Sequence, residues 1–154
     1  MKYRLLASRA NAATLFIRAM VGVVFLSEGI QKFLYPADLG SGRFAKIGLP
    51  APEFFGPLVG GFEVVCGGLV LCGLLTRLAA APLVGIMLVA LFTTKIPILL
   101  GTEFLGFALR PLPRYGLLSM LHESRNDISM LCGSLFLVVT GAGPWSIDRF
   151  LSRK

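Results

Sequence analysis

The sequence predicts an all-α membrane protein, a bundle of four transmembrane helices with the N- and C-termini on the cytoplasmic side. Composition is the first indication, because 55% of the residues are hydrophobic, 15% are charged and the mean hydropathy is +0.78. A soluble domain carries about 25% charged residues. The second indication is spacing, since apolar runs of about 20 residues, enough to span a hydrocarbon core, alternate with polar connectors. We expect a single membrane domain over residues 1–154.

The first transmembrane helix is expected over residues 12–33. Arg18 lies about two turns into this helix, and we expect its long side chain to extend back toward the basic end of the chain. Small and polar residues recur along one face of the helix, at Arg18, Gly22, Phe25, Gly29 and Lys32. Such a stripe suits close packing against another helix.

The second helix is expected over residues 55–75, where Glu63 interrupts a glycine-rich apolar run. Glycines permit close approach of two helix backbones. The connector before it, residues 35–54, is punctuated by proline and glycine. Its middle, Arg43 to Ile47, is either a short helix at the membrane interface or a solvated connector.

The third helix is expected over residues 78–99, directly after a minimal turn at Thr76-Arg77. The second and third helices therefore form an antiparallel hairpin. Pro97 lacks a backbone N–H and disfavours helical geometry in the residue before it. We expect the helix to kink or end around Thr94 to Ile96, beside Lys95.

The fourth helix presents a length problem. Its apolar part, residues 128–140, spans only about 20 Å at 1.5 Å per residue, whereas the hydrocarbon core is about 30 Å thick. The helix must therefore begin near Leu117 and cover residues 117–140, which places His122 and its polar neighbours inside the bundle. After it, Ser146 is expected to cap a short terminal helix with Asp148 in its first turn.

Basic residues favour cytoplasmic termini, because cytoplasmic segments carry an excess of lysine and arginine. This arrangement puts seven basic residues on the cytoplasmic side, at Lys2, Arg4, Arg9, Arg77, Arg149, Arg153 and Lys154. The opposite connectors carry Arg43, Lys46, Arg110 and Arg114. This excess of basic residues on the cytoplasmic side disappears if Lys32, Lys95 and Arg125, which lie within the helices, are counted with the opposite side.

Four separate segments then place ionisable residues in the outer half of the bundle. These are Glu28, Lys32, Glu63, Lys95, Glu123, Arg125 and Asp127. Glu28 and Lys32 share a helix face, Glu63 and Lys95 are expected partners across the hairpin, and Arg125 with Asp127 would complete a ring. Charges at this depth normally face protein or water. They form a binding or redox site, a structural ion-pair network, or side chains that extend outward.

Other classes of site find less support. The sequence has no cysteine-histidine ligand spacing, so no metal site is predicted, and Cys66, Cys72 and Cys132 are expected to be small buried hydrophobes. The net charge of +7 suits anionic lipid headgroups and not nucleic acid, because no aromatic residues alternate with the basic ones. The phenylalanines are expected in the core or against lipid. Catalysis would need a cofactor from elsewhere, and no catalytic residue can be named.

Several motifs occur in a fixed order along the chain. They are Arg18-x-x-x-Gly22-x-x-Phe25-Leu26-x-x-Gly29-x-x-Lys32, Gly48-x-Pro50-x-Pro52, Glu63 in a glycine-rich helix, Gly73-Leu74-Leu75-Thr76-Arg77-Leu78-Ala79 and Gly141-x-Gly143-x-Trp145-Ser146-x-Asp148. In this order the chain resembles the DoxX family of small four-helix membrane proteins over almost its whole length.

The resemblance implies a multi-pass protein of the cytoplasmic membrane with a redox-associated role. Relatives are linked to quinone-coupled sulfur oxidation, as subunits of a thiosulfate:quinone oxidoreductase, and to oxidative-stress complexes. A quinone is therefore the cofactor to consider, and the expected partners are the lipid bilayer, a soluble or membrane redox subunit and further copies of the chain. The alternative is a non-enzymatic assembly factor or a small-solute carrier, and whether the chain is catalytic stays open.

Overall fold

The computed structural model describes residues 11–152, which form helices and loops and contain no strand. The elements are α2 (Thr14–Leu34), α3 (Ser41–Ile47), α4 (Pro52–Cys72), α5 (Thr76–Ala90), the π-helical η1 (Leu91–Lys95), α6 (Ile96–Leu100), α7 (Leu117–Thr140) and α8 (Ile147–Ser152). Five of the basic residues behind the orientation argument lie outside the described residues, at Lys2, Arg4, Arg9, Arg153 and Lys154.

Three helices of the described chain are long and apolar enough to cross a membrane. They are α2, α4 and the continuous segment Thr76–Leu100 that α5, η1 and α6 form together. Large hydrophobic side chains on all three are exposed, as expected for surfaces that face lipid. The length argument put the start of the last long helix near Leu117, and α7 begins there and runs for 24 residues. The chain is an all-helical membrane protein.

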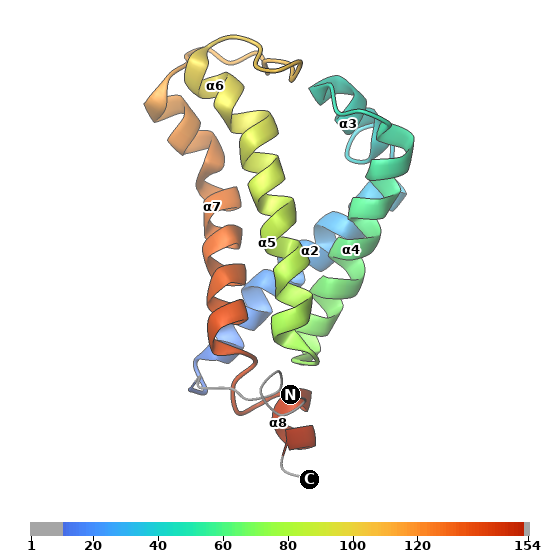
Figure 1. The fold of residues 1–154 in the computed structure, drawn as a ribbon, viewed down its shortest axis with the longest axis vertical. Coiled ribbons are helices and arrows are strands. Elements are labelled where there is room, and N and C mark those ends of the chain that lie inside the picture. Colours follow the sequence, from blue (N-terminus) through green and yellow to red (C-terminus); the bar gives the residue numbers. More distant parts are fainter. Residues whose placement is uncertain (1–10, 153–154) are drawn as a thin grey trace.

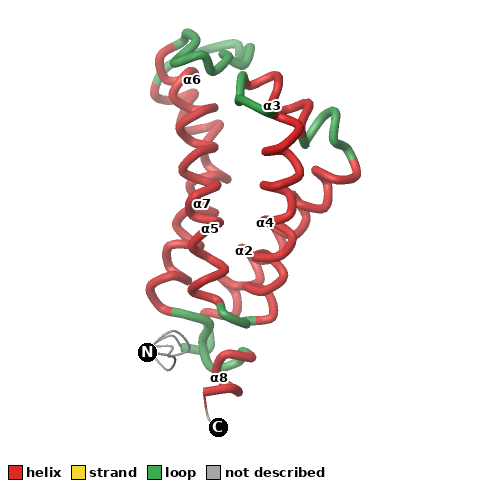
Figure 2. The backbone as a smooth tube through the Cα atoms, turned by 45° about the vertical axis from the view of Figure 1, so that its right-hand side comes forward, coloured by secondary structure: helices red, strands yellow, loops and turns green. Residues whose placement is uncertain are grey.

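The long helices form two pairs. α2 packs against α4, and α5 packs against α7, while α4 and α5 meet at their short connection (Figure 1). The pairs converge at the end that carries α8 and diverge toward the end that carries α3 and α6 (Figure 2). We term these the closed end and the open end.

Glycines set the contact between α2 and α4. A Cβ atom at Gly29 would lie 2.7 Å from the carbonyl oxygen of Gly60, and one at Gly67 would lie 2.7 Å from the amide nitrogen of Leu26. Only glycine permits backbones this close. The packing stripe predicted on α2 is confirmed, because all its members are buried, namely Arg18, Gly22, Phe25, Gly29 and Lys32.

Arg18 holds the closed end together and is only 3% exposed. Its guanidinium donates to four backbone carbonyl oxygens, those of Val70 (3.0 Å), Leu71 (2.9 Å), Ala142 (2.9 Å) and Trp145 (2.7 Å). One side chain on α2 thus joins the C-terminal end of α4 to the segment that follows α7. The expectation that Arg18 extends to the basic surface is wrong, because carbonyl groups from distant parts of the chain replace water around its N–H donors.

Asp148 completes the closed end and is 2% exposed. Its carboxylate accepts the backbone N–H groups of Leu75 (2.7 Å) and Thr76 (3.0 Å), and its own N–H donates to the carbonyl of Gly73 (2.9 Å). A carboxylate at a helix N-terminus satisfies free amides and interacts favourably with the helix dipole. Ser146 caps α8, as predicted. Asp148 does more than its sequence position indicated, since it also caps α5.

The turn between α4 and α5 lies at residues 73–75, just before the predicted Thr76-Arg77. α4 ends where Gly73 adopts a positive φ of 69°, which a glycine adopts without strain. The predicted antiparallel hairpin is present. At its other end, the interruption beside Lys95 is confirmed as a π-helical segment, η1, with Pro97 at the start of α6. Thr93 and Thr94 in this segment donate hydroxyl hydrogen bonds to carbonyl oxygens one turn earlier, at 2.9 and 2.6 Å.

The cysteines divide between the core and the surface. Cys66 is buried in the core, whereas Cys72 and Cys132 are exposed. The expectation of buried thiols is therefore wrong for two of the three. A thiol is apolar enough to be tolerated on a lipid-facing surface.

Replacing the buried arginine should open the closed end. We expect Arg18→Met to lower the free energy of unfolding by about 3 kcal/mol or more, because several carbonyl groups lose charge-assisted hydrogen bonds together. Thermal denaturation in detergent measures this loss. Arg125→Met is the matched control, since Arg125 is exposed on α7 and its change should stay within about 0.5 kcal/mol. Equal stability of the two variants would contradict the role of Arg18.

Candidate functional site

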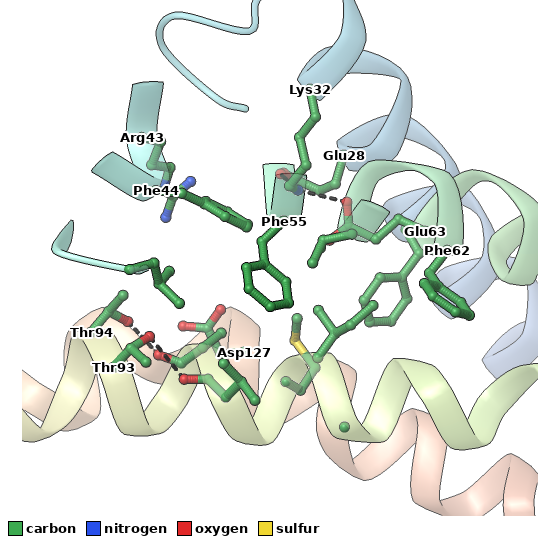
Figure 3. Close-up of a pocket in the computed structure, with 18 of the residues that line it drawn as sticks. Glu28, Lys32, Arg43, Phe44, Phe55, Phe62, Glu63, Thr93, Thr94 and Asp127 are labelled. Atoms are coloured by element: carbon green, nitrogen blue, oxygen red, sulfur yellow. Dashed lines mark hydrogen bonds and ion pairs between the residues drawn. The ribbon is translucent and has the colours of Figure 1, made fainter. Parts of the chain in front are cut away.

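A cavity of about 570 Å³ lies between the two helix pairs, and its lining reaches α3 at the open end. α2, α3 and α4 line one side, and α5, η1 and α7 line the other (Figure 3). Its charged and polar lining residues are Glu28, Lys32, Arg43, Glu63, Thr93, Thr94, Lys95, Asn126 and Asp127. The rest of the lining is mainly apolar. A few convergent polar groups in an apolar cavity of this size are typical of a ligand site.

The first ion pair joins Lys32 of α2 to Glu63 of α4, with 2.6 Å between Nζ and a carboxylate oxygen. Both side chains are buried, at 9% and 4% exposed. Glu28 adds a longer contact of 3.8 Å to Lys32, so the predicted pair on one helix face is also present. The expected pairing of Glu63 with Lys95 is wrong. α4 faces α2 through the glycine contact, and it diverges from the helix that carries Lys95.

The second ion pair joins Lys95 of η1 to Asp127 of α7 at 2.9 Å. The two side chains are 12% and 21% exposed, so this pair is somewhat less buried than the first. Asp127 points into the cavity from the α7 side, opposite Glu28, Lys32 and Glu63 (Figure 3). The cavity therefore has an ion pair on each side.

Two of the charged residues that the sequence grouped with these do not line the cavity. Glu123 pairs with Arg110 of the connector before α7, at 3.2 Å. Arg125 is exposed and donates to the carbonyl oxygen of His122 at 2.7 Å. Arg125 is two residues from Asp127 and therefore points about 200° around α7 from it. Glu123 lies one turn before Asp127 on the same helix face, and its carboxylate pairs with Arg110 beyond the cavity lining. The ring expected from the sequence is replaced by two separate pairs.

The two halves of the chain repeat one arrangement. In each half, a lysine near the C-terminal end of one helix pairs with a carboxylate about three turns into the next long helix. The two helices of each half also pack together. Lys32 and Glu63 lie almost as far apart along the chain as Lys95 and Asp127. A ligand between the halves would meet two similar half-sites.

Several lining residues were not recognised from the sequence. Phe44, Phe55 and Phe62 border the cavity, although phenylalanines were expected in the core or against lipid. The usable signal was the spacing of Phe55 and Phe62, which lie two helical turns apart on one face of α4.

Arg43 also lines the cavity, from the short helix α3. The sequence allowed either a short helix or a solvated connector in this segment, and the structure has the helix. It is exposed, and no ion pair of the described residues involves it. Its helical spacing to Ile47 was the available signal, because both residues face the cavity. A cation thus stands at the open end of the site.

Comparisons with known proteins identify relatives of this chain. The family model described as DoxX matches residues 13–96. An uncharacterized membrane protein of Mycobacterium tuberculosis (strain ATCC 25618 / H37Rv) is 50% identical over 151 residues, which cover 98% of this chain and 88% of the relative. No solved structure matches the chain.

Double-mutant cycles should separate the two ion pairs. We expect Glu63→Gln or Lys32→Met alone to cost about 3–5 kcal/mol, since each leaves a buried charge without its partner, and the double variant to recover much of this loss. Lys95→Met and Asp127→Asn should behave in the same way. Thermal unfolding in detergent provides the measurement. The cross-pair control, Glu63→Gln with Lys95→Met, should be additive within about 0.5 kcal/mol. Strong coupling across the cavity would refute the pairing.

Proposed function

The chain belongs to the DoxX family of membrane proteins, and we propose that it is a redox-associated subunit that binds a quinone between its two ion pairs. One observation supports this most strongly. A largely apolar cavity carries a buried lysine-carboxylate pair on one side and a partly buried one on the other, within helices suited to the membrane. Charges inside the membrane are costly and usually mark binding or transfer sites. A purely structural pair would be expected to be packed on all sides.

The proposal includes a four-span topology in the cytoplasmic membrane, with both termini on the cytoplasmic side. α7 has 24 residues, about 36 Å of helix, which is enough to cross the hydrocarbon core. Its polar residues pair, face the cavity or lie near the open end, so few are left against lipid. The open end then faces the outside and the Arg18 end faces the cytoplasm.

The lining suits a quinone. A quinone presents acceptor oxygens on opposite sides of a flat ring, and Lys32, Lys95 and Asn126 offer donors to them. Phe55 can pack against the ring, since it stands in the middle of the cavity (Figure 3). The volume of about 570 Å³ lies within the range usual for small-molecule sites.

The roles of the residues follow from the pairs. A bound quinone supplies a lipid-soluble acceptor of electrons and protons. Lys32 and Lys95 would donate hydrogen bonds through Nζ to its oxygens, and each is held in place by its carboxylate. Glu63 and Asp127 can hold or pass on a proton beside the ring. A soluble or membrane partner subunit would exchange the electrons.

An assembly factor or a small-solute carrier is the alternative. Transport of a solute through a single chain is disfavoured, because Arg18 and Asp148 hold the closed end together with buried hydrogen bonds. A solute that entered at the open end would meet this closed end. The quinone measurements below distinguish a quinone-binding subunit from an assembly factor that binds no ligand.

Reporter fusions test the topology. Fusions after Lys154 and in the α4–α5 turn should report a cytoplasmic location, and fusions near Gly42 and Arg110 should report an external one, because the long helices alternate in direction. Paired phosphatase and fluorescent-protein activities give the readout. A cytoplasmic signal at Gly42 would reverse the orientation.

Bound quinone tests the function. Organic extracts of the purified protein should contain a quinone. The double variant Lys32→Met/Glu63→Gln should retain the fold, but its quinone content should fall about tenfold or more, because the ammonium donor of Lys32 is gone. Quinone per protein is measured by chromatography of the extract. Glu123→Gln is the matched control outside the cavity and should keep its quinone.

Two results would count against the proposal. The first is a wild-type protein that carries no quinone and shows no saturable binding of added quinone. The second is a stable double variant that keeps full quinone content. Either would favour the non-enzymatic alternative.

A further inference from the structure

Building on the proposed function, we propose that the quinone enters the cavity sideways from the bilayer, through an apolar window between α4 and α5, and keeps its tail there. The expected ligand is therefore a quinone that carries a long isoprenoid chain, and not a quinone without a tail. The window is bordered by three residues of α4 and three of α5, namely Leu58, Val59, Phe62, Pro82, Gly85 and Val89.

The cavity has a polar end and an apolar end. Arg43, Thr94 and Lys95 lie toward the open end. Pro82 and Gly85 lie farther along α5 toward the closed end, where the neighbouring lining is apolar. A molecule with a polar head and an apolar chain would therefore have its head among the ion pairs and its chain beside α5.

The window residues belong to the cavity and to the outer surface at once. Leu58, Phe62 and Val89 line the cavity, yet they are 39%, 45% and 53% exposed. Gly85 is exposed as well. Side chains that line a cavity and are also exposed on the outer surface lie at the edge of an opening. α4 and α5 are joined by their short turn and diverge toward the open end (Figure 2), so the exposed lining residues lie where these two helices separate.

The window lies at the depth of the hydrocarbon core. Gly85 is about 14 Å from the start of α5 and about 22 Å from the end of α6, at 1.5 Å per residue. None of the six window residues is charged or carries a polar side chain. At such a depth lipid and not water stands outside, so an apolar chain can pass without losing hydration.

The connectors at the open end contact each other and partly cover it. The carbonyl oxygen of Ile47, the last residue of α3, accepts the N–H of Ala108 in the connector after α6, at 2.9 Å. A Cβ atom at Gly48 would collide with the carbonyl oxygen of Gly106. The two connectors thus touch through their backbones at the open end, whereas the window residues Leu58, Phe62 and Val89 are exposed.

A glycine pair allows a matched test of the window. An added Cβ meets no atom within 4 Å at Gly85 or at Gly61, so both positions have room for a side chain. Gly85 lines the cavity, whereas Gly61 of α4 does not. Gly85→Phe should fill the window, and Gly61→Phe should add the same ring outside it.

Two probes distinguish the tail from the ring. Menaquinone with four isoprene units and menadione share one ring system, but menadione lacks the tail. We expect Gly85→Phe to weaken binding of the prenylated quinone about tenfold or more and to change menadione binding less than about threefold, because only the tail occupies the window. Gly61→Phe should leave both unchanged. Binding is measured by equilibrium partition into protein-containing nanodiscs.

The outcomes separate the two proposals. If the wild-type protein binds both quinones and Gly85→Phe affects both equally or neither, the window is wrong and the proposed function stands. If the wild-type protein binds neither quinone, the proposed function fails and the window loses its ligand. Should Gly85→Phe not fold, Val89→Trp at the exposed edge of the window makes the same comparison.

Discussion

The buried guanidinium of Arg18 is the interaction on which the rest of the structure depends. A cation can be removed from water in a helix bundle only if hydrogen bonds replace its hydration. Arg18 finds these acceptors at the end of α4 and after α7, so burying it requires both segments to meet α2 at one place. Asp148 extends the same junction to the start of α5. All four long helices are therefore tied at the closed end, and their other ends do not need to meet.

The cavity follows from this one-sided closure. Glycines keep α2 and α4 in backbone contact along much of their length, so the divergence occurs between the helix pairs and not within them. Each lysine is neutralised by a carboxylate of its own half, Lys32 by Glu63 and Lys95 by Asp127. No ion pair of the described residues crosses the cavity. A ligand can thus enter or leave without exposing a bare charge to the apolar interior, which keeps the cost of occupancy low.

Periodicity and length predicted the parts of the fold that depend on nearby residues. The buried stripe on α2, the start of α7 and the interruption before Pro97 could all be read from spacing and propensity. The partners of the charged residues could not. Arg18 has a side chain long enough to reach either water or carbonyl groups, and its acceptors lie far along the chain. Glu63 was assigned to Lys95 because a short turn joins their helices, yet α4 and α5 diverge from that turn. Chain proximity says little about which faces meet when helices splay.

The repeated lysine-carboxylate arrangement also bears on how a ligand is oriented. The DoxX family match includes Lys32, Glu63 and Lys95 but ends before Asp127, so the second half-site is complete only with α7. Two similar half-sites suit a ring with acceptor oxygens on opposite sides. The halves are not equal, however, because Glu28 contacts Lys32 and α3 brings Arg43 to the cavity, while Asn126 stands beside Asp127 on the other side. With the tail held between α4 and α5, as proposed, this inequality would give the ring a single preferred orientation, with one oxygen at the half-site that carries more charged side chains.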